Sequence, residues 1–109
     1  MAYDLALAAR VREALGDNPE VSEREMCGGI AFMLSGNMAV GVSNEDLMVR
    51  IDPDDQGDAL TRPGVRVFDM TGRPMKGWIL VGPDVTAEDA DLHGWIEAGM
   101  EFAATFPPK

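Results

Sequence analysis

The residues of this sequence whose types and spacing could do chemistry are few, and one group lies near the C-terminal end. His93 stands between Asp89 and Glu97 at steps of four residues. On a helix these two steps drift by only about 80°, so one face could present all three side chains to a metal ion. The alternative treats them as the polar face of an amphipathic helix, opposite an apolar stripe. We favour the alternative, and the sequence predicts no metal site.

The one cysteine, Cys27, offers a thiol but no partner for it. A single cysteine excludes a disulfide within the chain and a zinc site built from several cysteines. Arg24 is the nearest cation in the sequence, and a lone thiol without an activating neighbour usually behaves as a small hydrophobic side chain. With a single histidine, no Ser-His-Asp or Cys-His-Asn set can be supported. The sequence therefore predicts no catalytic residues, no cofactor and a protein that is not an enzyme.

The basic residues gather in one window of an otherwise acidic chain. The formal net charge is −10 over 109 residues, which argues against direct binding to nucleic acid, because phosphate neutralisation supplies most of that affinity. Residues 62–76 reverse the sign, since they contain one acidic residue, Asp69, and four basic ones: Arg62, Arg66, Arg73 and Lys76. An anion or an acidic protein partner would be steered to this window.

The stretch TGRPMKGWILV, residues 71–81, contains two of these basic residues, Arg73 and Lys76, and it can be interpreted in two ways. In a structural interpretation, Gly72 and Pro74 shape a turn and Trp78 buries area in the core. In a functional interpretation, the stretch contributes to a contact surface. The candidate contact residues are Arg50, Arg66, Arg73, Lys76 and Trp78. Both interpretations stay open at the level of sequence.

The elements that would position these residues can be predicted from hydrophobic periodicity. Residues 3–15 have helical spacing, and residues 21–25 are expected to form a short turn, because Ser22 and Glu25 have capping-box spacing. Residues 29–42 alternate on both sides of a Ser-Gly-Asn loop, which is typical of a hairpin, and residues 47–51 add a third strand. Met33 and Met48 fall outside the main apolar sets and are candidates for a second, partly exposed sheet face.

The second half of the chain is predicted to add a short helix, two strands and a long helix. Asp52 and Pro53 have the types of an N-cap and a first helical residue. Strands are expected at 65–70 and 76–82, and a final helix follows from residue 86. The order α-β-β-β-α-β-β-α predicts one α+β domain over residues 1–109. It would have two layers, with an antiparallel sheet of about five strands backed by the terminal helices.

Several motifs in this order resemble the TfoX (Sxy) N-terminal domain family. The resemblance rests on MCGG at 26–29, AFM at 31–33, GNM at 36–38, LMVR at 47–50, RPG at 62–64, TGRPMKGW at 71–78 and PPK at 107–109. The family usually has an aromatic residue where Cys27 stands. The resemblance implies a two-layer fold similar to that of secretion chaperones. The family's two-domain members are bacterial regulators of natural competence that act with the cyclic-AMP receptor protein, and this chain is predicted to be a stand-alone N-terminal domain.

The function expected from this resemblance is that of an interaction module without enzymatic activity. It would act in regulation, through a protein partner or through self-association as a homodimer. The alternative is a small-ligand or anion sensor that uses Arg50, Arg73 and Lys76 beside Trp78. A cytoplasmic location is expected, because the N-terminus has no basic region typical of a signal peptide and no apolar run approaches the length of a membrane span.

Overall fold

A single open antiparallel sheet of six strands is the centre of the computed structural model, which describes residues 3–26, 28–69 and 74–109. Its strand order is β1-β2-β3-β4-β6-β5. The strands are β1 (Val21–Met26), β2 (Gly29–Leu34), β3 (Asn37–Ser43), β4 (Asp46–Arg50), β5 (Val65–Asp69) and β6 (Pro74–Val81). The helices are α1 (Leu5–Leu15), α2 (Gln56–Ala59), α3 (Pro83–Thr86) and α4 (Asp89–Ala103), with a 3-10 turn η1 (Pro53–Asp55) before α2.

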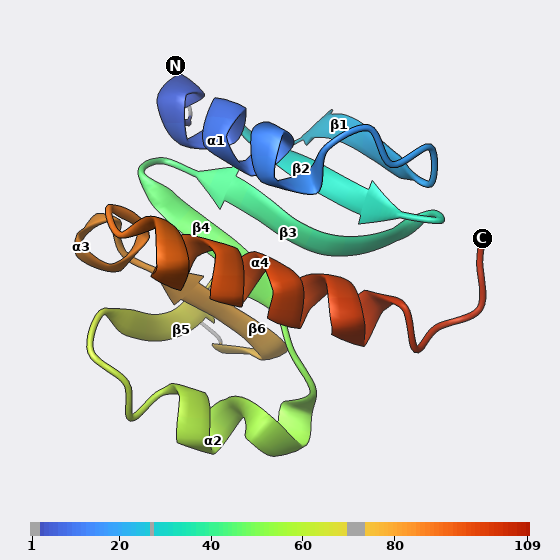
Figure 1. The fold of residues 1–109 in the computed structure, drawn as a ribbon. Coiled ribbons are helices and arrows are strands. Elements are labelled where there is room, and N and C mark those ends of the chain that lie inside the picture. The colour runs from blue at the N-terminus through green and yellow to red at the C-terminus, as the bar shows by residue number, and fades with distance from the viewer. Residues whose placement is uncertain (1–2, 27, 70–73) are drawn as a thin grey trace.

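The helices α1 and α4 cross the same face of the sheet, whereas α2 lies beside β6 (Figure 1). A sheet face that is apolar must be covered, and two amphipathic helices provide that cover. The predicted two-layer α+β class is therefore confirmed. We call the opposite side of the sheet, which neither α1 nor α4 covers, the open face.

Two local predictions from the sequence are confirmed, the hairpin within residues 29–42 and the cap at Asp52. β2 and β3 are joined by a two-residue turn at Ser35 and Gly36, whose φ angles of 50° and 86° are both positive, as a type I′ hairpin turn requires. The Asp52 carboxylate accepts a hydrogen bond from the backbone N–H of Asp54 at 2.9 Å. Asp52 therefore caps η1, and Pro53 is its first residue.

The sheet has one strand more than the five that were predicted. Residues 21–26 form β1, which pairs with β2 from Val21 opposite Leu34 to Met26 opposite Gly29, and the capped turn expected there is wrong. β1 is an edge strand, and residues 22–25 are exposed on both faces of the sheet. Apolar alternation is the signal by which a strand is predicted, and a strand exposed on both faces does not carry it.

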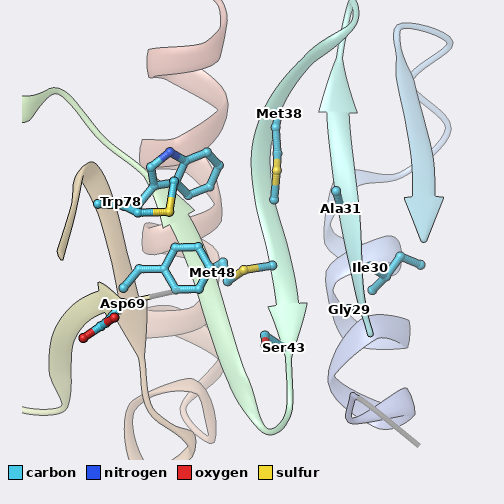
Figure 2. Close-up of a pocket in the computed structure, with 10 residues that line it drawn as sticks. Gly29, Ile30, Ala31, Met38, Ser43, Met48, Asp69 and Trp78 are labelled. Atoms are coloured by element: carbon cyan, nitrogen blue, oxygen red, sulfur yellow. The ribbon is translucent and has the colours of Figure 1, made fainter. Parts of the chain in front are cut away.

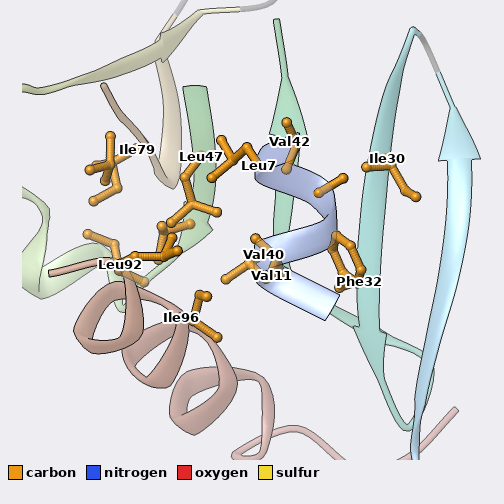
Figure 3. Close-up of a cluster of buried hydrophobic side chains, with 14 of the residues drawn as sticks. Leu7, Val11, Ile30, Phe32, Val40, Val42, Leu47, Ile79, Leu92 and Ile96 are labelled. Carbon is orange, nitrogen blue, oxygen red and sulfur yellow. The ribbon is translucent and has the colours of Figure 1, made fainter. Parts of the chain in front are cut away.

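The hydrophobic core fills the space between the helices and one face of the sheet (Figure 3). α1 contributes Leu7 and Val11, and α4 contributes Leu92 and Ile96. The strands contribute Ile30, Phe32, Val40, Val42, Leu47, Val49, Ile79 and Val81. Because side chains alternate along a strand, the residues between these apolar positions point to the open face.

The last helix, α4, is the longest helix that the structure describes, with 15 residues. No helix in the described part of the chain is both long enough and apolar enough to cross a membrane. After α4 the chain returns to the β2–β3 turn, where the Lys109 N–H donates to the Ser35 carbonyl at 2.8 Å and the Asn37 amide donates to the Pro107 carbonyl at 3.0 Å. These bonds hold the C-terminal residues against the sheet.

An ion pair joins α1 to β1. The Arg12 guanidinium donates to both carboxylate oxygens of Glu23, from Nε at 2.5 Å and from Nη2 at 2.8 Å. The hydrogen bond from Arg12 lowers the pKa of Glu23 below its ordinary value of 4.5. A carboxyl whose pKa is lower in the folded than in the unfolded state stabilises the fold above its unfolded pKa, and this contribution is lost as the pH falls through the folded pKa.

Replacing Arg12 by glutamine is therefore expected to have a small effect that depends on pH. Both side chains are more than one-third exposed, so the free energy of unfolding should fall by less than about 1 kcal/mol near neutral pH. The difference from the wild type should shrink as the pH falls below 4.5 and Glu23 becomes protonated in both states. Urea unfolding at neutral and at acidic pH measures it, with Arg24→Gln on the same edge strand as the control.

Candidate functional site

A row of paired residues crosses the open face from β2 to β5. Ala31, Gly41, Met48, Leu80 and Arg66 lie opposite one another on five successive strands. Gly41 is the one residue of this row without a side chain. A Cβ atom at Gly41 would lie 2.6 Å from the Met48 methyl carbon and 3.0 Å from that of Met38. The absence of a side chain at Gly41 therefore lets two methionine side chains lie over the strand.

The open face is hollowed at this place, with a volume of about 360 Å³ (Figure 2). In that view the helices lie behind the sheet, and the labelled side chains of Met38, Met48 and Trp78 lie on the near side. We call this depression the methionine hollow. It is lined by Gly29, Ile30, Ala31, Met38, Ser43, Met48, Phe68, Asp69, Met75 and Trp78. Its lining is mainly apolar, and three of the ten residues are methionines.

Two aromatic rings form one side of the hollow. Phe68 on β5 and Trp78 on β6 have ring centroids 6.3 Å apart and planes inclined at 59°. The position of Trp78 is set by its pairing with Arg50 on β4. The two rings are rigid, whereas the methionine side chains beside them are flexible and can adapt to the shape of a bound group.

The predicted contact residue Arg50 is packed among aromatic rings. Its Cζ atom lies 5.9 Å from the ring centroids of both Trp78 and Phe102, and 4.4 Å from that of Phe106. These distances are typical of cation–π contacts. Phe102 and Phe106 contact each other edge to face, with centroids 5.2 Å apart. Arg50 therefore links the strand β4 to the C-terminal end of α4, and the structure brings it together with Trp78 as the candidate site requires.

The other predicted basic residues lie apart from Arg50. Arg66 on β5 forms an ion pair with Asp46 at 2.5 Å, so part of its charge is compensated. Lys76 is exposed and follows Met75, a residue of the methionine hollow. Arg73 lies outside the residues that the structure describes. The predicted basic residues that the structure describes therefore lie on three different strands, β4, β5 and β6, and none of them is among the residues that line the hollow.

Asp89, His93 and Cys27 were the residues of the sequence considered for metal or thiol chemistry. Asp89 forms an ion pair with Arg10 at 2.8 Å, and His93 is exposed on α4. Within residues 3–26, 28–69 and 74–109, no group of three or more His, Cys, Asp or Glu side chains is placed to hold a metal ion. Cys27 lies outside the described residues.

Sequence reasoning named only some of the residues of the hollow. Met48 was predicted on the second sheet face and lines the hollow, and Met33 is half-buried opposite Met38. Trp78 was predicted as a contact residue. The roles of Gly41, Met38, Met75 and Phe68 were missed. The one signal for them was Gly41 itself, because a glycine inside a strand often marks a place where other atoms approach the backbone closely.

The comparisons with known proteins agree with the motifs of the sequence. Residues 13–103 match the model of a family described as the TfoX N-terminal domain. Comparisons with curated proteins and with solved structures found no significant match. The matched region includes the six strands of the sheet, α2, α3 and α4, but only the last three residues of α1. The chain therefore belongs to the TfoX N-terminal domain family.

Proposed function

We propose that this chain is an interaction module without enzymatic activity, which acts in regulation by binding a protein partner at the open face. The process it regulates would be transcription or competence, as in two-domain members of its family. The observation that supports the proposal is the methionine hollow, an apolar depression on the sheet face opposite α1 and α4. The partner would insert an apolar side chain between Met48, Met75 and Trp78.

The chemistry of the hollow favours a protein side chain as its occupant. Methionine side chains adapt to apolar groups of different shapes, and Trp and Arg are frequent at the centres of protein interfaces. The polar side chains in the lining are Ser43 and Asp69. An anion sensor, the alternative, would need cations with unsatisfied charge. It is less favoured because Arg66 is paired with Asp46 and Arg50 is packed against three rings.

The charges beside the hollow indicate that the partner segment is acidic. Arg24 lies opposite Ala31, which lines the hollow, so both are on the open face, and Arg24 is exposed. Lys76 is a second exposed cation, near the start of β6. The chain as a whole has a net charge of −10, so an acidic segment would be repelled from most of its surface and drawn to this side. We therefore infer a partner segment with an apolar side chain and a carboxylate that lies near Arg24, away from Asp69, the carboxylate in the lining of the hollow.

The test is a binding experiment with a variant confined to the rim of the hollow. Met75→Gln/Lys76→Glu makes one wall polar and reverses one charge, and circular dichroism would verify that it folds. The wild type, immobilised and exposed to a lysate of the organism that encodes it, is expected to retain a protein that the variant binds about tenfold more weakly or worse. Crosslinking should place the bound segment near Trp78, and that segment should be acidic and apolar.

The matched control is Leu5→Gln, which removes an apolar side chain that is 58% exposed on α1, across the sheet from the hollow. It should bind the partner as the wild type does. Equal binding by all three proteins, or a partner segment that is basic, would contradict the proposal. Light scattering after size exclusion tests self-association, and a wild-type dimer that the rim variant converts to a folded monomer would make a second copy the occupant and overturn the heterologous partner.

A further inference from the structure

A second depression lies on a different part of the molecule, between α4 and the segment made of η1 and α2. Its volume is about 420 Å³, and it shares no lining residue with the methionine hollow. We call it the acidic groove. It is lined by Ile51, Asp52, Asp55, Asp58, Ala59, Arg62, Trp95, Ala98, Glu101, Phe102 and Thr105. In Figure 1, α2 and α4 are seen as separate helices, with β6 beside them.

The floor of the acidic groove is apolar. Ile51 and Ala59 are buried, with 5% and 6% of their surface exposed. Trp95, Ala98 and Phe102 are half-buried along α4. The positions 95, 98 and 102 share one side of the helix, because residues three and four apart lie on the same face. Apolar side chains of a partner can therefore be buried along this side of α4.

The rim of the groove has an excess of negative charge. Four carboxylates line it, from Asp52, Asp55, Asp58 and Glu101, against one guanidinium, from Arg62. Asp52 is engaged as the cap of η1. Within the described residues, none of the four carboxylates is joined to a cation by an ion pair. The groove would therefore gain favourable contacts from cationic groups brought by a partner.

One guanidinium already lies in the groove. The Cζ atom of Arg62 is 5.0 Å from the centroid of the Trp95 ring. This is a cation–π contact, a type that binds guanidinium and ammonium groups of ligands as well as those of the same chain. Arg62 thus shows which chemical group this environment accepts, and its single charge is too small to neutralise the four carboxylates.

We propose that the acidic groove binds a basic, amphipathic segment of a partner protein, with arginine or lysine side chains toward the carboxylates and an apolar side chain toward Ile51 and Phe102. The floor supplies the apolar contact and the rim supplies the complementary charge. Nucleic acid does not fit, because four carboxylates repel phosphate. The inference goes beyond the proposed function, since its site and the charge of its partner segment differ from those of the methionine hollow.

The test uses Trp95 as the reporter. The sequence has two tryptophans, so Trp78→Phe leaves Trp95 as the only one. The probe is a short helical peptide with leucine on one face and arginine on the other, and its counterpart has glutamate in place of every arginine. The arginine peptide is expected to change the Trp95 fluorescence to saturation, and added salt should weaken its binding. The glutamate peptide is expected to produce no change.

Variants separate the groove from general attraction to an acidic protein. Asp55→Asn/Asp58→Asn is expected to weaken binding by about threefold to tenfold, since each exposed charge pair contributes modestly. Asp17→Asn/Glu20→Gln makes the same change in net charge between α1 and β1, and it should leave the affinity unchanged. Equal weakening by the two variants, or equal binding of the two peptides, would overturn the proposal.

The proposal can fail independently of the proposed function. The rim variant of the hollow, Met75→Gln/Lys76→Glu, should bind the arginine peptide with the affinity of the wild type. If this variant loses the peptide and the Asp55→Asn/Asp58→Asn variant retains it, the basic segment binds at the open face and the acidic groove is not its site. If the groove variant alone loses the peptide, the inference stands whatever partner the hollow binds.

Discussion

Replacing Phe32 by alanine is expected to lower the free energy of unfolding by about 3–5 kcal/mol. Phe32 is 1% exposed and is among the largest fully buried side chains in the described core. It lies on β2 beneath α1, opposite Glu23 on β1 and Val40 on β3 (Figure 3). Removing its ring leaves a cavity between the helix and the sheet, and a packed interior collapses only partly around such a cavity.

A loss of this size matters because small domains have a total stability of only about 5–15 kcal/mol. Urea unfolding followed by circular dichroism measures it, and the midpoint should fall while the slope is preserved. Leu5→Ala is the control, because Leu5 lies on α1 with 58% of its surface exposed and alanine is an equally good helix former. A Phe32→Ala effect no larger than that of the control would contradict the position of Phe32 in the core.

The second large effect on stability is expected when a single methyl group is added to α4, at Gly99. A Cβ atom at Gly99 would lie 2.6 Å from the carbonyl oxygen of Ala39 and 2.7 Å from Cγ1 of Val40. The helix therefore approaches β3 so closely that no side chain fits at this position. Gly99→Ala must move the helix or the strand, and overpacking of this kind costs about 1–3 kcal/mol.

A second glycine on α4, Gly94, provides a matched control whose effect on the free energy of unfolding should have the opposite sign. A Cβ atom at Gly94 would meet no atom within 4 Å, and Gly94 is exposed. Alanine restricts the unfolded chain more than glycine does, so Gly94→Ala is expected to raise the free energy of unfolding by about 0.5–1 kcal/mol. Urea midpoints of the two variants and the wild type test both signs together. A stabilising Gly99→Ala would show that α4 is farther from β3 than the structure places it.

The features that sequence predicted correctly are those that a few neighbouring residues determine. The hairpin around Ser35 and Gly36 and the cap at Asp52 both follow from local backbone chemistry. The family motifs added the expectation of a TfoX N-terminal domain, and residues 13–103 match the model of that family. The α+β class followed because periodic segments with an apolar face must bury it.

The features that sequence missed depend on residues that are distant along the chain or on an exposed edge. β1 was missed because its exposed residues do not alternate. The contact of Arg50 with Phe106 joins the end of β4 to the segment after α4, and no local pattern shows it. The acidic groove was missed for the same reason, since its lining comes from residues 51–62 and 95–105, which are distant along the chain. The arrangement of its carboxylates around Trp95 requires α2 and α4 to be placed in space.

The strand order has a consequence for the speed and order of folding. From β1 to β4 each strand pairs with the next one in the chain, and β5 pairs with β6. These hairpins close short loops and can form early, because the entropy lost in closing a loop grows with its length. Only the pairing of β4 with β6 joins the two halves across η1, α2 and β5. The rate-limiting step of folding is therefore expected to be the pairing of β4 with β6. After this step α4 can pack across β3 and β4.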